Sequence, residues 1–170
     1  MRARTLWLLS LVSTGAVVGA AVLVAPDRSG GPTVAPAAAS SSATSPTTRA
    51  VAVLEAWDRR RAAAWVRDDR VALRALYVRP SSAGRRDAAM LAAYHRRGLR
   101  VTTMQRQVLA LRLRTSAPRE LSFWVTDRLA VARVSGPRGS IVLPRSRPAT
   151  HRIVLRRGPT GWQVVEVYDD

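Results

Sequence analysis

The stretch HRIVLRRGPTGWQVVEVY, residues 151–168, decides the fold class of this chain. Its first half alternates two sets of side chains: His151, Ile153 and Leu155 on one face, and Arg152, Val154 and Arg156 on the other. Gly158 to Gly161 then predicts a turn, and Trp162 to Tyr168 predicts the returning strand. Alternation with a period of two, broken by a glycine-rich turn, is typical of an antiparallel hairpin.

Further strands are expected before this hairpin. Residues 99–114 alternate imperfectly and are long enough to bend or bulge. Residues 121–126 alternate more cleanly, Asp127-Arg128 predicts a turn, and residues 129–134 predict a return strand. A loop rich in Gly, Pro and Arg is expected around Ile141 to Leu143. Strands joined by short turns imply an antiparallel sheet.

Helical patterns fill the first half of the domain. Residues 49–66 are dominated by Ala, Leu, Arg and Glu and contain no Gly or Pro, which predicts a helix. Asp69 is the expected N-cap of a short second helix that carries Leu73, Leu76 and Tyr77. A third helix is expected over residues 85–97, with Gly98 as its stop. Helices followed by strands predict an α+β domain over residues 49–170.

This order of elements resembles the NTF2-like (SnoaL-like) α+β cone superfamily. The resemblance rests on RALY (74–77), YHRRGLRV (94–101), VTDRLAV (125–131) and GWQVVEV (161–167), and it covers residues 49–170. The same combination is similar to uncharacterised, membrane-anchored exported proteins of high-GC actinobacteria. The resemblance implies three helices packed on a curved antiparallel sheet around a conical pocket. Members serve as isomerases or cyclases, as ligand pockets, or as non-catalytic assembly modules.

The N-terminal region predicts a membrane anchor. Leu6 to Ala25 contains no charge and is long enough, at about 1.5 Å per residue, to cross a bilayer as a helix. Arg2 and Arg4 place residues 1–5 in the cytoplasm and the domain outside. The alternative is a cleaved signal peptide, since Gly19 to Ala21 or Ala37 to Ala39 could form the cleavage site, and the protein would then be secreted.

Two further expectations concern the region before the domain. Residues 26–48 are rich in Pro, Ser, Thr and Ala and predict a disordered linker. Gly15 and Gly19 form a GxxxG pair within the span, which would allow homodimerisation in lipid. The sheet is an alternative dimer surface.

Charge and composition exclude several classes of protein. All 28 cationic residues are Arg, against 11 acidic residues, and the net charge is +17. The absence of Cys excludes disulfides, thiol nucleophiles and Cys-ligated zinc. Predicted export argues against nucleic acid as the partner of this charge. The hypothesis in its place is an envelope protein, anionic lipid or anionic polymer as partner, and the alternative is a solvated surface rich in Arg that binds no partner.

Few residues suggest chemistry. Only two His are present, no metal-ligand spacing occurs, and no phosphate loop occurs, so neither a metal nor a cofactor is expected. The resemblance makes Tyr94, His95 and Asp127 the candidates for a polar pocket residue, although an ordinary turn residue or helix end explains each. Asp58, Asp68, Asp69 and Asp87 are expected on helix surfaces or ends. Of Trp57, Trp65, Trp124 and Trp162, we expect three in the core.

The sequence thus favours an anchored, exported, non-catalytic accessory or assembly module of the cell envelope. The first alternative is a cone-pocket isomerase, cyclase or small-molecule binder. The sequence therefore does not decide whether the protein is an enzyme. A secreted binder of anionic envelope polymers is the second.

Overall fold

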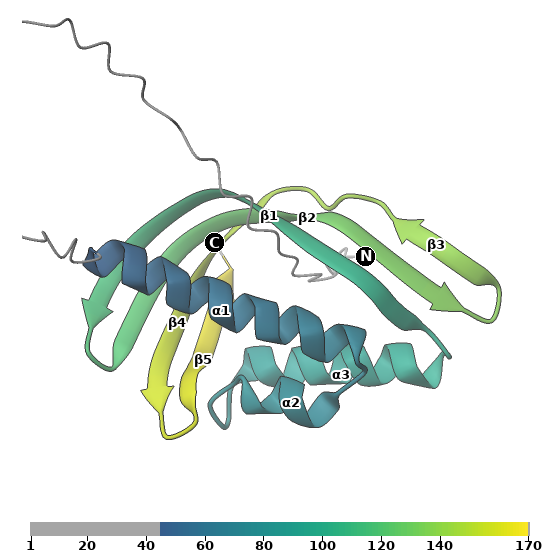
Figure 1. Ribbon diagram of the computed structural model, residues 1–170, viewed down its shortest axis with the longest axis horizontal. Helices are drawn as coiled ribbons and strands as arrows, with labels where there is room; N and C mark the ends of the chain where they lie inside the picture. The colour runs from purple at the N-terminus through teal and green to yellow at the C-terminus, as the bar shows by residue number, and fades with distance from the viewer. Residues whose placement is uncertain (1–44, 170) are drawn as a thin grey trace, which may run out of the picture.

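Three helices and five strands build the domain, and the computed structural model describes residues 45–169. The elements are α1 (Pro46–Val66), α2 (Arg70–Ala75), α3 (Ser82–Arg96), β1 (Arg100–Ala117), β2 (Glu120–Gly136), β3 (Gly139–Leu143), β4 (Ala149–Gly158) and β5 (Gly161–Asp169). The sheet curves around α1, and α2 and α3 lie beside that helix (Figure 1). The predicted α+β class, with helices packed on a curved antiparallel sheet, is confirmed.

The predicted anchor is not part of the described structure. Within residues 45–169 no helix is long and apolar enough to cross a bilayer. Leu6 to Ala25, the preceding residues 1–5 and the Gly15/Gly19 pair all lie outside the described residues. The predicted span therefore stays a prediction.

The named strands all pair antiparallel, with the order β1-β2-β4-β5 and with β3 also paired to β2. One isolated parallel bridge joins Tyr77 to Val164 of β5. β1 runs along one edge of β2 for nearly its whole length. The other edge is shared, because β4 pairs with residues 120–127 and β3 with residues 132–136. Four register shifts interrupt the β1–β2 pairing, which is how a strand of 18 residues bends around the helix.

The turn predicted at Asp127-Arg128 is wrong. β2 continues through both residues, which pair with Val108 and Gln107 of β1. Asp127 follows Val125 and precedes Leu129 on the buried face of the strand. A charged residue is accommodated there because Arg106 and His151 contact its carboxylate. The loop expected around Ile141 to Leu143 is also wrong, since these residues form the end of β3.

Capping residues set where the helices begin. α1 starts at Pro46, inside the predicted linker, because the Ser45 side chain accepts a hydrogen bond from the Thr48 amide. α3 starts at Ser82, three residues before its predicted start. Asp69 caps α2 as predicted, accepting from two backbone amides of the first turn. Gly98, with φ of 66°, ends α3 as predicted.

Large side chains fill the interior between the helices and the sheet. Trp57 and Trp65 from α1 and Phe123 from β2 are fully buried, and Leu, Val and Ile side chains from the strands surround them. Trp162 packs against this core while partly buried. Three of the four Trp residues therefore belong to the core, as predicted.

One carboxylate fastens α3 to the sheet. Glu166 of β5 accepts hydrogen bonds from the Ser82 and Ala83 amides, both at 2.9 Å, at the beginning of α3. Partial burial acts to raise the pKa of Glu166, but hydrogen bonds from Ser82, Val167 and Ala83 outweigh burial and lower it. A negative charge at a helix N-terminus also interacts favourably with the positive end of the helix dipole.

We expect Glu166→Gln to destabilise the domain by about 1 kcal/mol at neutral pH, since Gln retains the shape but not the charge. The pKa of Glu166 is lower in the folded state than in the unfolded state, where it is about 4.3. Its contribution is therefore complete above that unfolded value and disappears as the pH falls through the folded pKa. Denaturant unfolding of both proteins from neutral to acid pH measures the difference, which should shrink on acidification. A difference independent of pH would contradict this role.

Candidate functional site

Two groups of charged side chains are buried in the interior, and α1 contributes to both. We call the first the cone cluster; its members are Asp58 of α1, Arg106 of β1, Asp127 of β2 and His151 of β4. We call the second the helix cluster; its members are Arg61 and Trp65 of α1, Tyr77 after α2, and Asp87 of α3. Buried charges are rare unless they are paired, so both clusters are candidate sites.

Arg106 is the centre of the cone cluster. Its Nη1 donates a hydrogen bond of 2.7 Å to Asp127 Oδ2, and its Nη2 forms an ion pair with Asp58 Oδ2. His151 Nε2 lies 2.9 Å from the same Asp127 oxygen. One guanidinium thus joins two carboxylates, and an imidazole lies against one of them.

Strand parity explains how the cone cluster is assembled. Asp127 lies on the same face of β2 as Phe123 and Val125, and His151 shares a face of β4 with Ile153 and Leu155, so these residues point into the core. Val125 is the registered partner of His151 and Asp127 is that of Ala149, so the imidazole lies two residue pairs from Asp127 on the same face of the sheet. Asp58 follows Leu54 by four residues on α1 and lies on the same buried face.

The cone cluster is closed to solvent. The exposed fractions of Asp58, Arg106, Asp127 and His151 are 3%, 0%, 6% and 1%. Burial lowers the pKa of the Arg106 guanidinium, while the charge and hydrogen bond of Asp127 act to raise it. A carboxylate beside an imidazole can transfer a proton to a substrate only where the substrate reaches it. Here the surrounding side chains leave the pair almost no contact with solvent.

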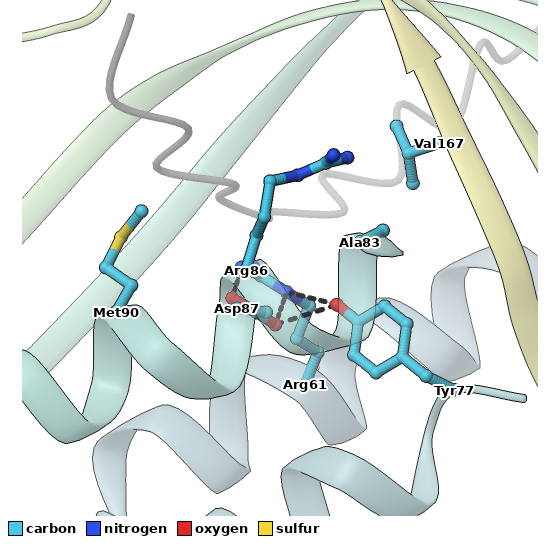
Figure 2. A pocket seen from close by; sticks show the side chains of 7 residues that line it. All are labelled: Arg61, Tyr77, Ala83, Arg86, Asp87, Met90 and Val167. Carbon is cyan, nitrogen blue, oxygen red and sulfur yellow. Dashed lines mark hydrogen bonds and ion pairs between the residues drawn. The ribbon is translucent and has the colours of Figure 1, made fainter. Parts of the chain in front are cut away.

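The helix cluster is organised around Asp87. Oδ1 of Asp87 accepts from Arg61 Nη2 at 2.5 Å and from Trp65 Nε1 at 3.0 Å. Oδ2 accepts from Arg61 Nε and from the Tyr77 hydroxyl, both at 2.7 Å. Figure 2 shows Arg61, Tyr77 and Asp87 converging, with dashed lines marking their contacts. Both carboxylate oxygens are thereby satisfied, and α1, α3 and the segment after α2 are joined.

The environment fixes the charge states of this cluster. Burial and the Asp87 charge raise the pKa of Tyr77 far above its usual range, so the phenol remains a hydrogen-bond donor. Burial acts to lower the pKa of Arg61, but Asp87 and Tyr77 outweigh burial and raise it, so the guanidinium remains charged. A Tyr and an Arg that cannot exchange protons near neutral pH are unsuited to acid-base catalysis.

A pocket of about 30 Å³ adjoins the helix cluster (Figure 2). Its walls are Arg61, Tyr77, Ala83, Arg86, Asp87, Met90 and Val167. This volume holds one or two water molecules and no organic substrate.

The three candidates predicted from the sequence lie in different places. Asp127 belongs to the cone cluster. Tyr94 packs edge-on against Trp65 and is half-buried, and burial raises the pKa of its hydroxyl. His95 is exposed and pairs with Asp68 at 2.5 Å. The structure therefore does not bring Tyr94 and His95 together with Asp127 in a common pocket.

Sequence reasoning missed three members of the cone cluster, namely Asp58, Arg106 and His151. Asp58 and Asp87, expected on helix surfaces or ends, are both buried. The alternation of His151 with Ile153 and Leu155 contained the signal for burial of the imidazole. Arg106 follows buried Met104 by two residues on the same face of β1, but an Arg in a strand is normally exposed, so the alternation gave no signal for its burial. Among the described residues no three His, Asp or Glu side chains are arranged to hold a metal ion.

Solved structures share this architecture at low sequence identity. The intermembrane space region of the chloroplast protein ARC6 aligns with a TM-score of 0.50 and 16% identity, over 72% of this chain and 95% of that chain. Aln2 from a Streptomyces species aligns with a TM-score of 0.50 and 14% identity, over 72% and 91%. A protein of the NTF2-like family from Streptomyces avermitilis aligns with a TM-score of 0.49 and 14% identity, over 71% and 94%.

The expected NTF2-like cone is thus confirmed at the level of fold. No protein-family model matches the chain, and no curated protein matches its sequence. TM-scores of 0.50 show a shared fold, and identities of 14–16% say nothing of a shared activity.

We expect Asp87→Asn to cost about 3–5 kcal/mol of unfolding free energy, because it leaves the Arg61 guanidinium buried without its counter-charge. Tyr77→Phe removes the hydrogen bond donated to Asp87 and the longer one accepted from Arg61 Nε but keeps the ion pair, so about 1–2 kcal/mol is expected. Glu55→Gln, at the exposed Glu55–Arg59 pair of α1, is the control and should cost under about 0.5 kcal/mol. Denaturant unfolding measures all three. Equal costs for Asp87→Asn and Glu55→Gln would refute the structural role of the helix cluster.

Proposed function

We propose that this chain, which has the NTF2-like cone fold, is a single-pass membrane protein that presents a non-catalytic accessory module outside the cell. Its N-terminus lies in the cytoplasm, and the module takes part in assembly within the cell envelope. The observation that carries the proposal is the state of the cone interior: it is filled, and its charged groups pair with one another.

A pocket enzyme of this fold needs space beside its polar groups. Ligand pockets usually measure about 300–1,000 Å³ and expose a few convergent polar atoms to the ligand. In this domain Trp57, Trp65 and Phe123 occupy the interior, and the cone cluster is almost wholly excluded from solvent. The small pocket beside Asp87 is an order of magnitude below that range, and the larger hollows, of about 470–520 Å³, are lined by none of the four residues of the cone cluster. The large side chains that fill the interior and the pairing of its charged groups both support a structural role for the interior.

Anchoring is supported by the sequence alone. Leu6 to Ala25 matches the thickness of the hydrocarbon core, and Arg2 and Arg4 favour a cytoplasmic N-terminus. A module tethered in this way needs no catalytic site to act, since it can position a partner protein at the envelope. Dimerisation through Gly15 and Gly19 or through the sheet remains a prediction.

One observation favours a second candidate function. Asp127 and His151 lie 2.9 Å apart inside the cone, and such a pair could act as a general acid and base on a small molecule. Under this alternative the cone opens to admit an apolar ligand, and the protein is a binder or an isomerase or cyclase. The two functions differ in whether the folded protein takes up a ligand.

We expect no rise in melting temperature when the wild-type protein is screened against flat aromatic and polycyclic ligands. Trp57→Ala provides the positive control, because removing this buried indole leaves a cavity and costs about 3–5 kcal/mol. Added indole should then stabilise that variant but not the wild type. A ligand that stabilises the wild type and loses its effect in Asp127→Asn would support the second function instead.

The mass of the mature protein tests the anchor. We expect the exported chain to begin at or next to Met1, to resist extraction from membranes by carbonate, and to be open to protease only from outside. Deleting residues 1–25 should remove membrane retention. A mature N-terminus near Ala21 or Ser40 would show instead a secreted protein, which is the form expected of a polymer binder.

A further inference from the structure

One end of the domain gathers arginines around two hollows. At this end α1 begins, and the β1–β2 and β4–β5 turns lie beside it (Figure 1). The first hollow, of about 470 Å³, lies between Arg49 of α1, Arg157 of β4 and Trp162 of β5. The second, of about 520 Å³, lies between Arg157 and Arg119 of the β1–β2 turn. We call Arg49, Arg119 and Arg157 the basic triad.

The backbone holds the basic triad in place. The Arg157 amide donates a hydrogen bond of 3.0 Å to the Arg119 carbonyl, which ties the β1–β2 turn to the end of β4. Arg49 lies in the first turn of α1, whose beginning is capped by Ser45. The three side chains therefore project from fixed points on three elements, and the two hollows separate them.

The positive charge of the triad is not neutralised within the described residues. All three side chains are exposed, and no carboxylate of residues 45–169 lies within ion-pair distance of them. The acidic residue of the same turn, Glu120, lies 3.9 Å from Arg156. Three guanidinium groups that form no ion pair among the described residues line two adjoining hollows, with Arg157 common to both. Such a group is a site for anionic oxygens, which Arg binds in a forked geometry.

We propose that the basic triad binds phosphate groups of anionic lipids in the membrane that anchors the chain. This inference rests on the proposed function for its anchor, and it adds which end of the module meets the bilayer. The chain reaches the domain at this end, because Ser45 and Pro46 begin α1 there. Trp162, partly exposed beside Arg157, supplies the aromatic side chain that favours the membrane interface.

Because the chain is anchored in the same membrane under this proposal, weak contacts of the basic triad with lipid are sufficient for docking. Nineteen residues, Pro26 to Thr44, separate the predicted span from Ser45. Behaving as a coil, a segment of this length spans roughly 25 Å, so the triad is confined to the immediate neighbourhood of the lipid surface. Each Arg close to an anionic surface is expected to favour the docked state about fivefold, and three of them about 100-fold.

Docking can be measured on the full chain in vesicles. The protein has no Cys, so Thr160→Cys in the β4–β5 turn accepts a single fluorophore. Quenching by lipids that carry a headgroup quencher reports contact between this end and the bilayer. Vesicles of phosphatidylcholine are compared with vesicles that also contain phosphatidylglycerol, at about 0.1 M and about 1 M salt, where the screening length falls from about 10 Å to about 3 Å.

The expected result is strong quenching with phosphatidylglycerol only, reversed by high salt. Replacing Arg49, Arg119 and Arg157 with Gln should lower the ratio of docked to undocked protein about 100-fold. The matched control replaces Arg96, Arg100 and Arg138 with Gln, which removes the same charge near the other end of the β1–β2 hairpin. In this control the ratio of docked to undocked protein should stay within a few-fold of that of the parent protein.

Several outcomes would overturn the inference. They are equal quenching in both kinds of vesicle, insensitivity to salt, and an equal loss in the control. Triad-dependent binding of soluble polyphosphate without docking on vesicles would show that lipid is the wrong source of phosphate. Carbonate extraction is scored separately: a chain that is extracted contradicts the anchor, while quenching by added vesicles still decides the role of the triad.

Discussion

Two opposite charges on one helix constrain the whole domain. Asp58 and Arg61 are one turn apart on α1, and both point into the interior. Each would cost several kcal/mol if it were left unpaired. Asp58 needs Arg106 of the sheet, and Arg61 needs Asp87 of α3. α1 can therefore occupy only a position between the curved sheet and α3, and moving it in either direction would leave a buried charge without its partner.

The same pairing decides what the interior can do. In an open cone a carboxylate and an imidazole at 2.9 Å would be ready for proton transfer. Here Asp127 is also held by Arg106, and large aromatic and aliphatic side chains cover the group. Groups that would serve chemistry in a wet pocket instead fasten β1, β2 and β4 to α1. This pairing supports the proposed function of the domain as a non-catalytic module.

The outer surface is more basic than the composition alone suggests. Of the ten acidic residues in 49–170, Asp58, Asp87 and Asp127 are buried, whereas only two of the 25 arginines, Arg61 and Arg106, are buried. Folding thus buries a larger fraction of the acidic side chains than of the arginines, and most arginines remain exposed. This excess matters most where turns and a helix end bring exposed arginines together without carboxylates, as at the basic triad. An anionic surface close to the domain is the environment that this distribution suits.

Local patterns in the sequence determined the α+β class, the Asp69 cap, the Gly98 stop and the final hairpin, because propensity and period-two alternation act over a few residues. The same local patterns predicted a turn at Asp127-Arg128. Two charged residues between apolar runs resemble a turn when the buried partners of the Asp are unknown. Those partners, Asp58, Arg106 and His151, come from three elements far apart in the chain. Only the tertiary structure brings them together, and it decides whether a charged residue lies in a turn, on a helix surface or in the core, because the cost of burying a charge depends on which opposite charge lies beside it.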